Sequence, residues 1–201
     1  MGFLSPSVSF TRYRMEEPVP DGFWDQALEM LNSMAFREME SSAEISSGWA
    51  SVINPFQEEI TMRDISFGNY LLVSMRVDQK KIPAALLKKH CLWEEQKTRD
   101  MKGLQRLSGK MRKEIRERVK MQLLLKAMPI PSTHDVCWNI QHGQILFFSC
   151  QEKMQGTFED LFFRTFRLKP TPVIPYSLAT DLLSDPGRES SLKELAPEVL
   201  I

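Results

Sequence analysis

The sequence has 201 residues, of which 42% are hydrophobic and 26% charged, so a buried core is expected and disorder throughout the chain is excluded. Its 26 Lys and Arg residues balance 26 Asp and Glu residues, which gives neither the basic excess of a typical nucleic-acid binder nor the acidic excess of a cation store. No apolar run approaches the roughly 20 residues that span a membrane. The first ten residues lack a secretion signal, and 3 cysteines are too few for a disulfide framework, so a reducing cytoplasm is expected.

The N-terminal part of the chain predicts strands around one amphipathic helix. Residues 7–14 alternate between apolar and polar in the manner of a strand. A helix capped by Asp21 is expected over 21–34, because apolar residues recur there at helical spacing. A short extended piece at 48–49 then leads to a buried strand over 67–77.

A pair of helices is the longest predicted feature. Pro83 suits the first turn of a helix that covers residues 84 to about 106. A turn at 107–109, in which Ser108 is the candidate N-cap, leads to a second helix over 110–127. Two successive helices joined by a short link form an antiparallel hairpin.

The C-terminal part returns to strands and one more helix. Strands are expected at 136–140 and 144–150. A weak capping box at Thr157 predicts the start of an aromatic-rich helix. The last residues are polar and predict a tail that holds a short helix at 191–195.

Two segments of the chain echo each other. Gly68 and Gly143 each precede a buried strand, a polar link and a helix. The echo predicts an α+β fold with a pseudo-duplicated strand and helix core into which a basic helical hairpin is inserted, and chance similarity between two buried strands is the alternative. The expected division is a core domain of residues 1–79 and 129–180, a hairpin insertion of 80–128 and a C-terminal tail of 181–201.

The balanced total hides a segregation of charge. Residues 80–126 hold 15 Lys and Arg against 5 Asp and Glu, so this segment carries a net +10 and the remainder −10. Charge beyond a Debye length of about 10 Å is screened, so the local charge selects the partner. The segment is therefore able to bind a polyanion, although a solvated helical face explains the pattern equally well.

No motif in the sequence predicts an active site. The chain contains no phosphate-binding glycine-rich loop, no Gly-x-Ser-x-Gly elbow and no His-Glu-x-x-His helix. His134 and Cys137 are spaced like a metal pair, but three residues apart on a strand they face opposite sides. We therefore expect no catalytic residue, no metal and no cofactor.

The helical pair carries the pattern that indicates function. On the second helix, Met111, Ile115 and Val119 form an apolar stripe, which leaves cations on the roughly opposite face. A cation at every helical turn is able to follow a phosphate backbone, and such binding is driven by counterion release. Lys and Arg without nearby Asn or Gln pairs suited to base edges predict contact without sequence reading. Trp93 is expected in the core or in an interface rather than on a stacking surface, so duplex DNA is favoured over single strands.

Several short motifs occur in a fixed order along the chain. They are Met34-Ala35-Phe36, Ser47-Gly48-Trp49, the Gly68 strand leading into Lys80-Lys81-Ile82-Pro83, Leu123-Leu124-Leu125-Lys126-Ala127, Trp138-Asn139-Ile140, the Gly143 strand and Pro172-Val173-Ile174-Pro175. Each motif is weak alone. Together, over about residues 1–180, they make the chain resemble RdgC, a family of bacterial recombination-associated proteins.

The resemblance implies a nucleoid-associated protein that binds duplex DNA without sequence preference and restrains RecA-dependent strand exchange, meeting RecA through the DNA. It also implies a dimeric ring with a basic inner surface. DNA contact is expected at Lys81, Lys97, Arg99, Lys102, Arg106, Lys110, Arg112, Lys113, Arg116 and Lys120.

Two departures from the family pattern bear on assembly. The resemblance implies that two contacts close the ring, one at the tip of the helical hairpin region and one from the C-terminal part. The family normally continues for a further large segment, so the second of these contacts is expected to be absent or replaced. The family's Leu-Leu-Pro-Arg-Ala-Phe reads Leu-Leu-Leu-Lys-Ala-Met here, which puts Leu125 and the softer Met128 at the expected oligomer contact. An open dimer is therefore an alternative to a closed ring. A protein-interaction or oligomerisation module that has lost DNA encirclement is the second interpretation, and an enzyme is the third.

Overall fold

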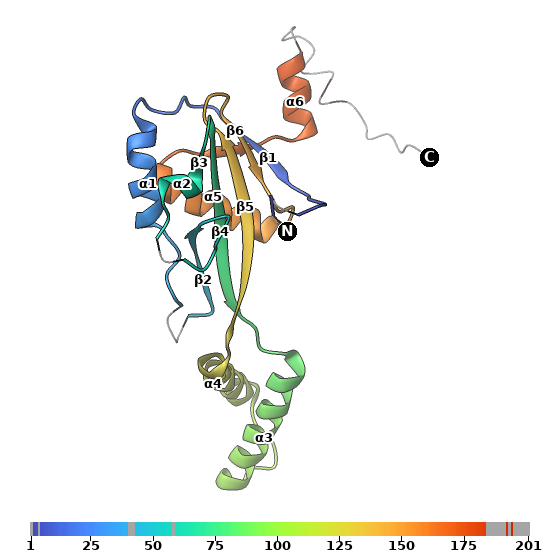
Figure 1. The fold of residues 1–201 in the computed structure, drawn as a ribbon. Coiled ribbons are helices and arrows are strands. Elements are labelled where there is room, and N and C mark those ends of the chain that lie inside the picture. Colours follow the sequence, from blue (N-terminus) through green and yellow to red (C-terminus); the bar gives the residue numbers. More distant parts are fainter. Residues whose placement is uncertain are drawn as a thin grey trace.

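The computed structural model describes residues 2–3, 5–39, 43–57, 59–183, 192 and 194, and it shows an α+β fold. The strands form one antiparallel sheet in the order β2-β4-β5-β6-β1-β7, with β3 paired to β4 (Figure 1). In chain order the elements are β1 Thr11–Met15, α1 Phe23–Ser33, β2 Ile45–Ala50, α2 Met62–Ile65, β3 Ser66–Phe67, β4 Tyr70–Lys80, α3 Ala84–Lys102, α4 Gly109–Lys126, β5 Pro129–Asn139, β6 Gln144–Phe147, α5 Glu152–Phe166, β7 Pro170–Pro172 and α6 Pro175–Leu182.

The main core lies between one face of the sheet and the helices α1 and α5. Phe158, Phe162 and Phe166 are four residues apart on α5 and therefore share one side of the helix. Phe158 stacks on Phe147 of β6 with 4.5 Å between ring centroids, and Phe162 lies 5.1 Å from the buried Trp138 of β5. This aromatic layer fixes α5 against the sheet.

A close backbone approach joins β2 to the segment after α1. The Trp49 N–H donates to Met34 O, and the Phe36 N–H donates to Trp49 O. A Cβ atom on Gly48 would lie 2.5 Å from Phe36 Cα. The position therefore requires glycine for space, and it anchors the two motifs around Met34 and Trp49 to each other.

The opposite face of the sheet carries a smaller apolar cluster of Leu72, Cys137 and Phe148. The N-terminal segment crosses this face, where the rings of Phe3 and Phe10 contact Phe148 at 6.1 and 6.0 Å between centroids. Alternation along β4 thus sends successive side chains to two different apolar layers.

Strands β4 and β5 extend beyond the rest of the sheet. Their ladder pairs Tyr70 with Asn139 at one end and Lys80 with Pro129 at the other, over eleven residues. β6 pairs only with residues 136–139 of β5, so the half that holds Pro129 and Pro131 has β4 as its paired strand. Proline is tolerated there because a strand with one neighbour has an edge that needs no N–H donor. The two helices α3 and α4 are connected to this end of the ladder (Figure 1).

Several predicted boundaries are wrong, each for a local reason. Helix α1 has Gly22 in the left-handed region as its N-cap rather than Asp21, and no side chain caps it. Helix α5 begins at Glu152, so the predicted capping box at Thr157 lies inside the helix, where its hydroxyl donates to Lys153 O. The sequence hid this start because residues 152–157 are mostly polar.

Other expectations differ in extent. Helix α3 ends at Lys102 instead of about 106, because Gly103 adopts a left-handed conformation (φ 61°). The expected strand over 67–77 is a hairpin of β3 and β4 that turns at Gly68 (φ 62°). Helix α6 was not predicted and begins on Pro175, which suits a first turn. The helix expected at 191–195 lies largely outside the described residues, and the pseudo-duplication and the domain division stay predictions.

Candidate nucleic-acid interface

The helical hairpin formed by α3, the loop 103–108 and α4 has clear local causes. Pro83 precedes α3 as its N-cap, and Gly103 ends that helix. Ser108 caps α4 as predicted, since its side-chain oxygen accepts a hydrogen bond from the Met111 N–H at 3.3 Å. The loop between the helices is short, so α4 returns along α3.

A narrow apolar seam holds the hairpin together. Ile115 and Val119 of α4 are buried with Leu107 of the loop, and Leu87 and Cys91 of α3 pack against them. The predicted stripe on α4 therefore faces α3. In contrast, α3 has no buried residue along its 19 positions. The hairpin is thus a thin structure that exposes most of its surface.

All ten cations expected to contact DNA are exposed, but they do not share one face. A groove of about 640 Å³, here called the first groove, is lined by Lys88 of α3 and by Arg112, Lys113 and Arg116 of α4. A second groove of about 570 Å³ is lined by Lys97, Lys102 and Arg118 together with the carboxylates of Glu94 and Glu114. The seam of Ile115 and its neighbours lies between the two grooves. The structure therefore places three of the expected cations, Arg112, Lys113 and Arg116, at the first groove and two, Lys97 and Lys102, at the second, whereas the other five line neither groove.

Carboxylates neutralise some of these cations. Arg112 Nε lies 3.9 Å from Glu95 Oε2, and Arg118 Nη2 lies 3.1 Å from Glu94 Oε2, so each pair crosses from α4 to α3. Lys120 Nζ lies 2.9 Å from Glu44 Oε2, which precedes β2. This ion pair joins the hairpin to the sheet domain. The helical spacing predicted that Lys120 lies free on the same face as Lys113, and that prediction is wrong for Lys120.

The remaining eight expected cations make no ion pair within the part of the chain that the structure describes. Arg116 lies close enough to Cys91 to act on its thiol: burial raises the pKa of Cys91, while Arg116 opposes that rise. The eight cations are Lys81, Lys97, Arg99, Lys102, Arg106, Lys110, Lys113 and Arg116.

Comparison with known families identifies the family of the chain. Residues 9–181 match the model of a family described as "Putative exonuclease, RdgC". The chain belongs to the RdgC family. The resemblance drawn from the short motifs is thereby confirmed over nearly the whole range they span, and a place in the RdgC family makes this a recombination-associated, DNA-related protein. No curated protein matches the chain.

The residues expected at an oligomer contact in RdgC proteins lie at the neck of the hairpin. Leu125 is in the last turn of α4, and Met128 lies between α4 and β5 with 84% of its surface exposed. Met121 and Ile130 are exposed nearby in sequence and were not singled out by motif analysis. The neck is at the opposite end of α4 from the hairpin loop, and the oligomer contact itself stays a prediction.

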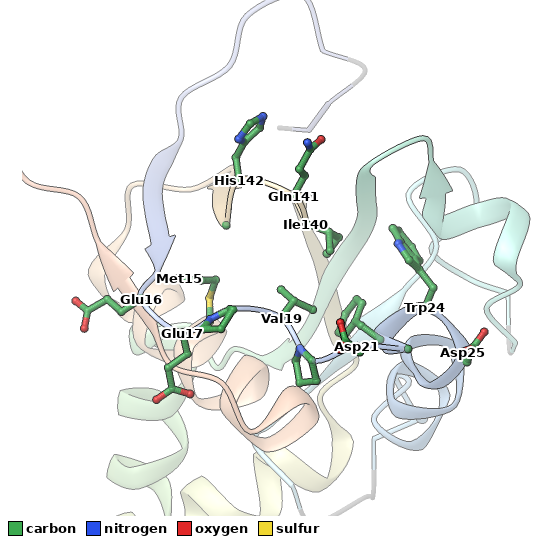
Figure 2. A pocket seen from close by; sticks show the side chains of 15 residues that line it. Met15, Glu16, Glu17, Val19, Asp21, Trp24, Asp25, Ile140, Gln141 and His142 are labelled. Atoms are coloured by element: carbon green, nitrogen blue, oxygen red, sulfur yellow. The ribbon is translucent and has the colours of Figure 1, made fainter.

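A cavity of about 730 Å³ lies at the other end of the sheet, away from the hairpin. Val19, Ile140 and Trp24 form its walls, and Glu17 and Asp25 lie at its rim with their carboxylates spread apart (Figure 2). Sequence analysis missed this cavity, because its residues come from two distant loops. Among the described residues, no group of three or more His, Cys, Asp or Glu side chains is placed to hold a metal ion, and no helix is long and apolar enough to cross a membrane.

Proposed function

We propose that this RdgC-family chain binds duplex DNA through its helical hairpin without reading the base sequence. The observation that carries the proposal is the set of eight exposed hairpin cations without an ion-pair partner among the described residues. Their positive charge is available to phosphates, whose neutralisation releases condensed counterions. Lys and Arg contacts of this kind position a protein on DNA but carry no sequence information.

The first groove is the expected centre of this contact. Lys113 and Arg116 lie on α4 with Lys88 opposite them on α3, so cations from both helices converge on one concave surface. A concave basic surface concentrates the field on a polyanion. Membership in a DNA-associated family supports this choice over the alternative of a purely solvated helical face.

The cellular role follows from the same property. A protein that covers duplex DNA without sequence preference limits access of RecA to its strand-exchange partner, so contact with RecA is indirect and runs through DNA. We propose that the chain acts in this way in the bacterial nucleoid and as a dimer. The exposed apolar neck at Leu125 and Met128 supports self-association.

The decisive variant reverses two charges of the first groove, Lys113→Glu with Arg116→Glu. If about six phosphates are engaged, log affinity falls with log salt at a slope near −5, and the variant slope is near −3.5. At 50 mM salt its duplex affinity falls about 100-fold by the same relation. Fluorescence anisotropy with a labelled duplex between 50 and 200 mM salt measures both. Lys120 is left unchanged, because Lys120→Glu would oppose Glu44.

The matched control is Lys153→Glu with Lys169→Glu, which makes a charge change of the same size at exposed positions of the sheet domain that form no ion pair among the described residues. It is expected to keep the wild-type slope. Unchanged duplex binding in the hairpin variant would contradict the assignment of the site. Absence of any duplex binding at low salt, with a stable oligomer on size-exclusion chromatography, would favour the oligomerisation module instead.

We propose no catalytic role for this chain, although the family description names an exonuclease. The same protein samples test this point when they are incubated with end-labelled duplex or single-stranded DNA and Mg²⁺ or Mn²⁺. Shortening of the labelled strand in proportion to protein concentration would show that the chain is an enzyme.

A further inference from the structure

The tryptophans of the chain differ sharply in exposure. Trp49 and Trp138 are buried in the main core, and Trp24 is half-buried beside Phe23. Trp93 of α3 is 63% exposed. Of the two positions expected for Trp93, the core is therefore wrong, because α4 covers the opposite side of α3 and leaves the indole in solvent, and the interface stays a prediction.

The neighbours of Trp93 are cations whose charge is available. Lys97, one helical turn on, places its Nζ 5.6 Å from the centroid of the indole ring. Lys89, one turn before, is exposed as well. The adjacent carboxylates are engaged by cations of α4, since Glu94 pairs with Arg118 and Glu95 with Arg112. Glu94 and the exposed Glu114 both line the second groove, so the cations available beside the indole are Lys89 and Lys97.

The surface around Trp93 fits an unpaired nucleotide. Every base has a π face that stacks on an exposed aromatic ring, while flanking cations hold its phosphates. Lys89 and Lys97 lie four residues before and four residues after Trp93, so the three side chains share one exposed side of α3. A strand whose base stacks on Trp93 therefore has a cation on either side of the indole for its phosphates. A fully paired duplex keeps its base faces covered and gains nothing from the indole.

We propose that Trp93 is a base-stacking residue, so that the hairpin holds single-stranded DNA on the side of α3 that carries Lys89, Trp93 and Lys97, and duplex DNA in the first groove. The proposal rests on the DNA binding proposed above and adds a separate surface for a separate form of DNA. It assigns the exposed indole and its two flanking lysines a common ligand.

The test compares three forms of the full chain: wild type, Trp93→Leu and Trp93→Phe. Leucine keeps an apolar side chain but removes the π face, whereas phenylalanine keeps a ring. Affinity for an oligo-dT strand is expected to fall about 5- to 100-fold in Trp93→Leu and much less in Trp93→Phe. Affinity for a duplex of equal length is expected to stay within twofold. Tryptophan fluorescence of the wild type should be quenched by oligo-dT, and this quenching should be lost in both variants.

Each outcome decides the matter. Equal loss of single-strand and duplex affinity in Trp93→Leu, or no loss of either, would overturn the stacking role. A change of oligomeric state in Trp93→Leu on size-exclusion chromatography, with oligo-dT affinity intact, would assign the indole to a protein contact. Lys113→Glu with Arg116→Glu separates the two proposals: it weakens duplex binding about 100-fold at 50 mM salt if the first groove is correct and leaves the effect of Trp93→Leu on oligo-dT in place.

Discussion

The sheet domain and the helical hairpin are built on opposite plans. In the sheet domain, large aromatic side chains such as Trp49 and Phe158 are fully buried between two layers. In the hairpin, α3 buries no residue and three apolar residues form the buried seam. The small number of buried residues indicates that packing within the hairpin contributes little to fixing its position. The β4–β5 ladder fixes that position instead, so most of the hairpin surface is able to carry charged side chains.

The first and largest expected effect compares the two cores directly. Phe158→Ala removes a ring that stacks on Phe147 and contacts Tyr13, so the free energy of unfolding should fall by about 3–5 kcal/mol. Ile115→Ala, in the thin seam, should cost about 2 kcal/mol, because the few atoms around it are able to relax. Urea denaturation followed by circular dichroism measures both. Equal losses would show that the hairpin is packed as firmly as the sheet domain.

A smaller effect concerns alkaline pH and is expected at Tyr13 of the sheet domain. Burial, with the hydroxyl donating to Glu159 Oε1 at 2.9 Å, raises the pKa of Tyr13 above its usual value near 10. The folded state therefore keeps a proton that the unfolded state releases, so stability is intact below pH 10 and falls as the pH rises above it. Tyr13→Phe should lose about 1 kcal/mol at neutral pH and should flatten this alkaline decline. Denaturation midpoints at pH 8, 9.5 and 11 provide the measurement, and an unchanged decline in Tyr13→Phe would assign it to another group.

The smallest effect lies at the boundary between the two regions. Glu44 and Lys120 form an exposed ion pair, so Glu44→Gln should lower stability by less than about 1 kcal/mol. The same change frees the Lys120 ammonium and should raise duplex affinity severalfold at low salt. Fluorescence anisotropy with the labelled duplex measures the affinity of this variant. A large loss of stability with no gain in affinity would show that the pair stabilises the fold and does not keep Lys120 from DNA.

The features that the sequence predicts are those that depend on residues close together in the chain. The apolar stripe of Met111, Ile115 and Val119 and the Ser108 cap were predictable, because both depend on residues within one helix. The first half of β5 was not, because Pro129 ordinarily ends regular structure and its tolerance depends on an unpaired sheet edge. A periodic pattern of residues also does not identify a pairing strand that is distant in the chain.

The candidate site shows the same limit. Exposure of the cations followed from their helical spacing, and the structure bears it out. Their division into two grooves did not follow, since it depends on how α3 and α4 lie against each other. The pairing of Lys120 with Glu44 joins residues 76 positions apart, and no local pattern carries that information.

The eleven-residue ladder also has a mechanical consequence. Both strands that enter the hairpin do so at the same end, and at about 3.4 Å per residue they run some 34 Å into the sheet. A pull on the hairpin would load β4 and β5 together along their axes rather than peel one from the other. The tension would then pass sideways as shear into β2 and β6, where many hydrogen bonds must break at once. The ladder is thus suited to bear a force that acts on the hairpin.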